Sequence, residues 1–259
     1  MRVARVVAAI GTAGALVVLP ACGSDGGGTS DGTAATTTTV VDGAGLEVGR
    51  QYVEAMAADG GPDTEAMVAL SAPGSIADDY AVHLGALADV QEAAGEPVDQ
   101  GEVTVEGDKV FLRLEGTGGV IVDTRWSDFT LDDQGRLVDF TIDDEPLDDR
   151  LVVGGASDAV RGVTATVVSA FELVSNDSPV VVVEIKNDGR GRYRLVSADY
   201  TAPDGVTGDT TPVGQGLVVP RGATSRAVLA FPRAAFGGTV TLHGAAGESP
   251  LEIALPLTP

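Results

Sequence analysis

The chain holds a single cysteine, Cys22, among its 259 residues, and this scarcity excludes several kinds of chemistry. If that residue is modified, the rest of the chain has no disulfide, no thiolate nucleophile and no cysteine metal site. A folded protein without disulfides depends on hydrophobic cores large enough to fold unaided. The length allows one large domain or two ordinary ones.

Histidine and aromatic residues are also scarce, with two histidines in the chain and aromatics at 4%. Nucleophilic hydrolysis needs a base beside a Ser or Cys, but His83 and His243 fall in different predicted domains, and neither has a Gly-x-Ser-x-Gly motif nearby. The histidines are not clustered for metal binding, and Trp126 is the only tryptophan that could stack on a sugar. We therefore predict no catalytic residue, no metal site and no cofactor.

Carboxylate pairs are the remaining candidates for a metal site. Calcium needs about six to eight oxygen ligands at alternating loop positions. The run Asp132-Asp133-Gln134-Gly135 is too short for such a loop and matches a hairpin turn instead. We interpret the other pairs, such as Asp78-Asp79, as solvated acids.

Positive charge is in short supply, since 16 Lys and Arg face 38 Asp and Glu for a net charge of −22. Beyond residue 21 the 14 remaining Lys and Arg face all 38 acids, which gives −24. Nucleic-acid binding depends on neutralising phosphates with Lys and Arg, so this balance excludes nucleic acid as a partner. Anionic lipid headgroups repel such a surface as well.

The chain has no confident membrane-spanning segment near its start. The apolar stretch at residues 6–19 is 14 residues long, and a spanning helix needs roughly 20. Arg2 and Arg5 precede this stretch, and Pro20-Ala21 follows it with a small, helix-breaking end. This charge and length pattern is typical of an exported protein's signal peptide.

The run Val17-Val18-Leu19-Pro20-Ala21-Cys22 resembles a bacterial lipoprotein signal with its lipobox. The resemblance implies that residues 1–21 are removed and that Cys22 carries acyl chains such as palmitate. The protein would then be anchored at the extracytoplasmic face of the cell membrane. An ordinary secretory signal with an incidental cysteine is the alternative. The excess of Arg over Lys, with abundant Ala, Gly, Val and Asp, resembles the usage of actinobacteria.

Residues 22–43 are dominated by Gly, Ser, Thr and Asp, with little that could be buried. We predict a flexible tether, which at about 21 residues has a root-mean-square span of roughly 25 Å.

Residues 44–150 predict an α+β domain. Apolar spacing indicates helices at about 45–58, 64–70 and 76–94, the last two capped by Asp63 and Ser75. The period then changes to two, and turn signals separate four strands. They lie at residues 98–106, 109–116, 120–131 and 136–143. The prediction is three helices on a four-stranded antiparallel sheet.

This element order resembles the cone-shaped fold of nuclear transport factor and ketosteroid isomerase. The pattern Trp126-Ser127-Asp128-Phe129-Thr130, followed by Asp139-Phe140-Thr141, is similar to that of exported actinobacterial proteins. The resemblance implies a cavity between helices and sheet. Tyr52, Tyr80 and Asp128 are conceivable lining groups for isomerase chemistry, although Tyr80 lies on an apolar stripe that favours a core position.

Residues 144–158 are acidic and contain Pro and Gly, so we interpret them as a connection that docks through Leu151–Val153. Residues 159–259 hold about seven short strand candidates between turn signals, which is typical of an all-β sandwich. The segments Val180–Asn187 and Leu217–Phe231 resemble the immunoglobulin-like domain of Gram-positive surface lipoproteins.

We therefore expect a lipid-anchored envelope protein that acts as a non-catalytic binding or scaffolding module. Its partners would be the membrane, through Cys22, and another envelope component. Two alternatives stay open: a carrier that holds a small apolar ligand in the α+β domain, and an isomerase-like or hydrolytic enzyme in that domain.

Overall fold

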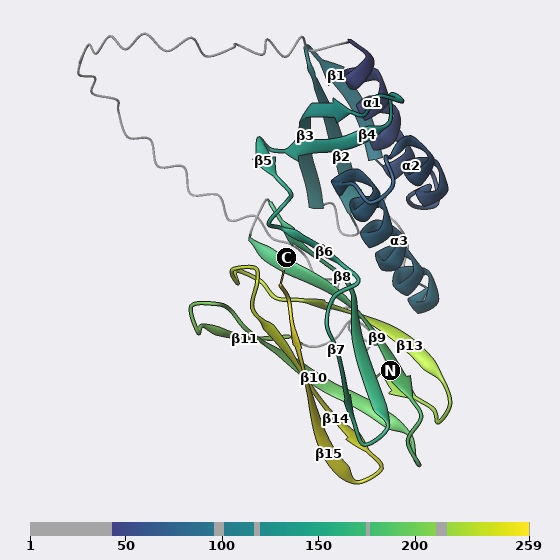
Figure 1. The fold of residues 1–259 in the computed structure, drawn as a ribbon, viewed down its shortest axis with the longest axis vertical. Coiled ribbons are helices and arrows are strands. Elements are labelled where there is room, and N and C mark those ends of the chain that lie inside the picture. The colour runs from purple at the N-terminus through teal and green to yellow at the C-terminus, as the bar shows by residue number, and fades with distance from the viewer. Residues whose placement is uncertain (1–42, 96–100, 117–119, 175–176, 211–216, 259) are drawn as a thin grey trace, which may run out of the picture.

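A computed structural model describes residues 43–95, 101–116, 120–174, 177–210 and 217–258. Three helices and an antiparallel sheet form an α+β unit (residues 43–150), and two further antiparallel sheets form a β-sandwich (residues 151–258). The two parts follow each other along the long axis of the molecule (Figure 1). The expected class, α+β followed by a sandwich, is confirmed at this level.

The three helices agree with the sequence prediction to within about two residues at each end. They are α1 (Gly43–Met56), α2 (Thr64–Leu70) and α3 (Ile76–Ala94). Asp63 accepts a hydrogen bond from the Ala66 backbone N–H at 3.0 Å, and Ser75 accepts one from Asp78 at 3.3 Å. The side chains of these two N-caps therefore satisfy backbone donors that the first helical turn leaves unpaired.

The sheet of the α+β unit has five strands in the order β1-β2-β3-β4-β5. They are β1 (Gly101–Glu106), β2 (Lys109–Gly116), β3 (Val120–Leu131), β4 (Leu137–Ile142) and β5 (Glu145–Pro146). The sequence predicts four strands, and β5 is added by a tight turn in which Asp143 and Asp144 have φ of 53° and 67°. Asp-Asp is a weak signal for such a turn compared with Asn-Gly. Residues 98–100, predicted as the start of the first strand, lie outside the described residues.

Two sheets pack face to face in the sandwich. The β8 sheet has the order β13-β9-β8-β6, with β7 also paired to β8, and the β10 sheet has the order β11-β10-β14-β15, with β12 also paired to β10. The strands are β6 (Leu151–Val153), β7 (Ser157–Val160), β8 (Val163–Leu173), β9 (Ser178–Asn187), β10 (Tyr193–Thr201), β11 (Thr207–Thr210), β12 (Val218–Val219), β13 (Thr224–Ala230), β14 (Thr239–Ala246) and β15 (Ser249–Pro256). The expected connection at residues 144–158 thus contains β5, β6 and the start of β7.

The valine run of β9 is buried on both faces of its sheet. Val181 and Val183 belong to the core between the two sheets, whereas Val180 and Val182 pack against α3. A continuous apolar run, in place of alternation, is what a strand covered on both sides requires.

A bulge in β8 changes which of its residues face the helix. The register with β9 shifts between Val167 and Ser169, so Val167 and Ala170 both face the sandwich core. Ser169 and Phe171 then lie on the face turned toward α3. The bulge thereby supplies one polar and one aromatic side chain to the contact between the two parts.

Candidate functional site

The contact between the α+β unit and the sandwich is the largest feature that the sequence prediction did not contain. The C-terminal half of α3 continues beyond its own sheet and lies on the outer face of the β8 sheet, where it contacts β6, β8, β9 and β13 (Figure 1). Ala86 and Val90 of α3 are buried there against Val180, Val182 and Val228. We call this contact the junction.

His83 is the buried polar centre of the junction. Its Nδ1 lies 2.9 Å from the Ser169 hydroxyl oxygen, and both side chains are buried. Its ring lies 5.8 Å from the ring of Phe171, and the Tyr80 and Phe171 rings meet edge to face at 5.1 Å. Burial lowers the pKa of His83 from 6.5 to about 4, because removal from water penalises the charged imidazolium. Near neutral pH this histidine is therefore uncharged.

Ion pairs lie at the rim of the junction. Arg226 of β13 pairs with Asp89 of α3 at 2.9 Å and with Glu184 of β9 at 3.3 Å. A second ion pair lies on the other face of the β8 sheet, where Arg150 pairs at 3.0 Å with Glu172, which also accepts a hydrogen bond from the Phe236 backbone N–H. Burial raises the pKa of Glu172, and Arg150 acts in the opposite direction. Of these ion pairs, the one between Arg226 and Asp89 joins α3 to the β8 sheet at the edge of the apolar contact.

Aromatic side chains occupy the interior of the α+β unit, where the carrier alternative would place its ligand. The Tyr80 ring lies 5.7 Å from the rings of both Trp126 and Phe140, and Tyr52 lies 5.6 Å from Phe140. Tyr52 donates a hydrogen bond to the Ala77 carbonyl at 2.6 Å. Burial raises the pKa of both tyrosines well above the ordinary value. Both phenols thus serve as core side chains in this interior.

Of the three conceivable isomerase groups, Tyr52 and Tyr80 share one core cluster, whereas Asp128 lies at the surface. Asp128 is exposed, has φ of 56°, and sits in a bulge between β3 and β4. Its carboxylate accepts hydrogen bonds from Thr141 at 2.9 Å and Ser127 at 3.3 Å. The bulge lets Trp126 and Phe129 pack against the same cluster, which accounts for that part of the sequence pattern.

His243 lies on β14, far along the chain from the junction. Its Nε2 is 2.6 Å from Asp199 and its Nδ1 is 3.4 Å from Glu252, on neighbouring strands of the β10 sheet. It is therefore a partly exposed cross-strand pairing residue, and the structure does not bring it near His83. His83 lies on α3 against the β8 sheet, whereas His243 lies in the β10 sheet. The sequence analysis likewise placed them in different domains.

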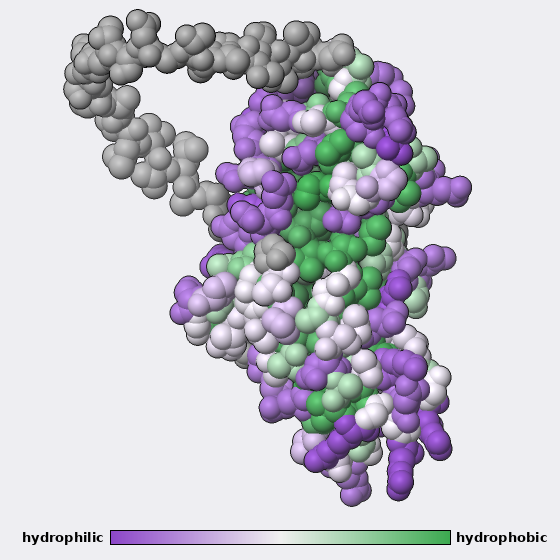
Figure 2. All heavy atoms as spheres, viewed as in Figure 1, coloured by the Kyte–Doolittle hydropathy of each residue, from purple (hydrophilic) through white to green (hydrophobic). Residues whose placement is uncertain are grey.

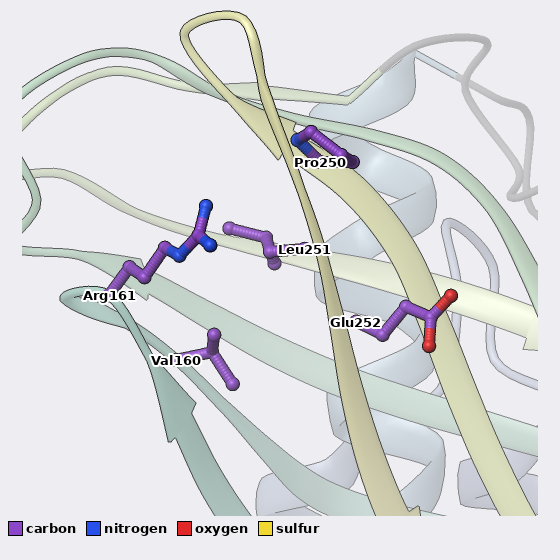
Figure 3. A pocket seen from close by; sticks show the side chains of 5 residues that line it. All are labelled: Val160, Arg161, Pro250, Leu251 and Glu252. Carbon is purple, nitrogen blue, oxygen red and sulfur yellow. The ribbon is translucent and has the colours of Figure 1, made fainter.

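An open hollow of about 340 Å³ lies at the edge of the sandwich, between the β7–β8 turn and β15. Its lining is Val160, Arg161, Pro250, Leu251 and Glu252 (Figure 3). The hollow has a partly apolar floor and one charge of each sign. It belongs to the sandwich and not to the α+β unit, where the sequence would place a cavity.

The carboxylate pairs do not form a metal centre in the described part of the chain, which has no group of three or more potential ligands close together. Asp132 accepts hydrogen bonds from the backbone N–H groups of Gln134 and Arg136, each at 2.9 Å, and pairs with the Arg136 side chain. These contacts hold the β3–β4 turn, in agreement with the hairpin interpretation. The same ranges contain no helix long and apolar enough to cross a membrane.

Apolar side chains gather across the middle of one face of the molecule, at the level where α3 meets the β8 sheet (Figure 2). Four partly buried residues from α3 and β8 pack against the clusters there: Leu84, Leu87, Val168 and Leu173. Leu173 contacts both clusters, so the apolar band is continuous with the junction core. Cys22, the candidate lipidation residue, lies outside the described residues with the rest of residues 1–42.

No protein-family model matches the chain, and no curated protein matches it significantly. Sequence reasoning missed the pairing of His83 with Ser169, since the two lie 86 residues apart. One signal was available: four consecutive valines at 180–183 leave no exposed face on their strand, so a second layer had to cover it.

Proposed function

We propose that this protein is a lipid-anchored component of a bacterial, actinobacterial-type cell envelope that binds or scaffolds another envelope component without catalysis. Residues 1–21 act as the signal peptide, Cys22 carries the acyl chains, and residues 22–42 form the tether up to the start of α1. Stable anchoring needs more than one acyl chain, and lipoprotein processing supplies two or three.

The junction is the single observation that supports this proposal most directly. Interfaces between domains of one chain allow relative motion unless they are large and apolar. Here α3 shares buried residues with the β8 sheet, and an ion pair between Asp89 and Arg226 joins the two parts at the edge of that contact. Because the contact limits motion between the α+β unit and the sandwich, the protein can hold a binding surface in a fixed orientation, as a scaffold must.

The positions of the ionisable groups support a non-catalytic role. His83 is used by the junction, His243 by a cross-strand pairing, and Tyr52 by the core. The aromatic cluster that fills the α+β interior weighs against the carrier alternative. For the finer fold classes, we propose that the α+β unit is of the nuclear transport factor type and that the sandwich is immunoglobulin-like. Element order and the two packed antiparallel sheets support these assignments.

Metabolic labelling with an alkyne fatty acid tests the anchor. The full chain and its Cys22→Ala variant would be expressed in an actinobacterial host, fractionated and weighed as intact proteins. We expect the label, the acylated mass and membrane association in the wild type only. An unlabelled soluble product with residues 1–21 still attached would refute the proposal, whereas a stoichiometric apolar molecule released by organic extraction would favour the carrier.

A further inference from the structure

Charge is distributed unevenly along the chain. Residues 43–150 contain 25 acids and 6 Lys or Arg, whereas residues 151–259 contain 10 acids and 8 Lys or Arg. Six of those eight cations lie at or beside the turns at one end of the sandwich: Arg161, Lys186, Arg190, Arg192, Arg194 and Arg221. We call this set the basic end. The same turns contribute only two acids, Asp188 and Glu248.

Buried hydrogen bonds hold the turns of the basic end together. Asn187 is fully buried, and its side-chain amide donates to the carbonyls of Gly191 at 2.8 Å and Val219 at 2.9 Å. The Asp188 backbone N–H donates to Gly162 at 2.8 Å, and that of Gly247 donates to Arg192 at 3.1 Å. Four separate turns are therefore fixed relative to one another, so their cations form one pre-arranged surface.

The cations of the basic end are exposed and mostly unpaired. All six residues are exposed, and within the described ranges the only ion pair among them joins Lys186 to Asp188 at 2.7 Å. Arg161 reaches over the hollow beside β15 without pairing (Figure 3). The guanidinium groups of the five arginines are therefore available to bind an anion, although the chain contains 38 acidic residues with which they could have paired.

We propose that the basic end binds a linear polymer of phosphate esters other than a nucleic acid. This polymer would be the partner of the scaffold proposed above, so the inference rests on that proposed function. The cations are spread over four turns and do not converge on a pocket, so an extended ligand fits them better than a small anion. Each exposed ion pair contributes little, and several together give useful affinity. Arginine matches phosphate geometry through bidentate hydrogen bonds.

The position of the basic end favours a polymer over the anchoring bilayer. Gly43, where the described chain begins, lies at the opposite end of the molecule from the sandwich turns (Figure 1). A body tethered through residues 22–42 would therefore turn its basic end away from the membrane. The acidic α+β unit repels polyanions at long range, but at about 150 mM salt the Debye length is about 8 Å and the basic end acts alone.

Binding of long-chain sodium polyphosphate by the full chain in neutral detergent tests the proposal, with this linear phosphoanhydride polymer standing in for the phosphate-ester polymer. The variant Arg192→Gln/Arg194→Gln is compared with Arg113→Gln/Arg233→Gln, which removes the same charge elsewhere. We expect saturable binding at about 150 mM salt that weakens about tenfold in the first variant and stays within about twofold in the second. The log–log salt slope should also fall by about 1.4 in the first variant only.

Several results would overturn the proposal: no saturable binding, an equal loss in both double variants, or preference for another anion. Tighter binding to polyglutamate would point to an acidic protein. Tighter binding to vesicles of equal phosphatidylglycerol and phosphatidylcholine would point to a membrane. Equal thermal unfolding temperatures of the wild type and both variants establish that folding is unaffected. None of these results depends on acylation, so a failure here is separable from a failure of the Cys22 experiment.

Discussion

Protonation of His83 should destabilise the folded protein in mild acid. The unfolded chain binds a proton at this histidine near pH 6.5, whereas burial in the junction lowers the folded-state pKa to about 4. Between these values the unfolded state holds more protons than the folded state. The free energy of unfolding therefore decreases as the pH falls from about 6.5 to about 4, and this loss is complete below the folded-state pKa.

The size of the effect follows from the interval between the two pKa values. At about 1.4 kcal/mol for each pH unit, the loss reaches about 3 kcal/mol. Other groups work in the opposite direction, since burial raises the pKa of Asp79, Asp139 and Glu172 and these carboxyls stabilise the fold as the pH falls. The charged groups at the edge of the junction are Asp89, Glu184 and Arg226, and Glu172 titrates on the other face of the same sheet. A measurement on the wild type alone would therefore mix several titrations.

A variant that cannot titrate isolates the contribution of His83. His83→Asn places an amide near the position of Nδ1, within reach of Ser169, and leaves every other titrating group in place. Urea unfolding of both proteins from pH 7 to pH 4 gives the difference in their free energies of unfolding. We expect this difference to shift by about 3 kcal/mol against the wild type across that range. Parallel curves would refute the argument, because they would mean that His83 titrates alike in both states.

Three substitutions and one control, Gly208→Ala, test the packing by urea unfolding at pH 7. Val182→Ala should lower the free energy of unfolding by about 1–3 kcal/mol, because Val182 is fully buried against α3. In a sandwich without a covering helix this position would be exposed, and the same substitution would cost little. Gly238→Ala should also cost about 1–3 kcal/mol, since its Cβ would lie 2.2 Å from the Thr201 carbonyl oxygen, while Gly208→Ala has nothing within 4 Å and should change stability by less than about 0.5 kcal/mol. Ser75→Ala should cost about 1 kcal/mol through loss of its N-cap.

The sequence predicted those elements whose ends carry strong local signals. Helix α3 has a serine N-cap and a left-handed Gly95 at its end, and the β1–β2 hairpin turns at Gly107 with φ of 66°. The short strands β5, β6, β7 and β11 were missed, since two to four residues give no measurable alternation. These short strands form because longer neighbouring strands supply backbone hydrogen-bond partners. Those partners lie in other parts of the sequence, so the short segments alone do not reveal the pairing.

The junction was missed because one helix has two buried faces. The predicted apolar stripe of α3 runs through Ile76, Tyr80, Leu84, Leu87 and Val90. Tyr80 packs in the α+β core, whereas Leu87 and Val90 pack in the junction. The contact with the sandwich also uses residues off that stripe that are polar or small, namely His83 and Ala86. Small residues permit close approach of a helix to a sheet, but hydropathy patterns give them little weight. The candidate site therefore could not be assembled from periodicity alone.

The junction and the uneven distribution of charge between the two parts both affect the orientation of the sandwich relative to the membrane. An anionic membrane repels the acidic α+β unit, which on the proposed anchoring is the part attached to the tether. That repulsion orients the basic end outward only while α3 couples the two parts. A proton on His83 weakens the coupling near pH 4 without altering the cations of the basic end. As the pH falls, the orientation of the basic end relative to the membrane should therefore change before its affinity for the polymer does.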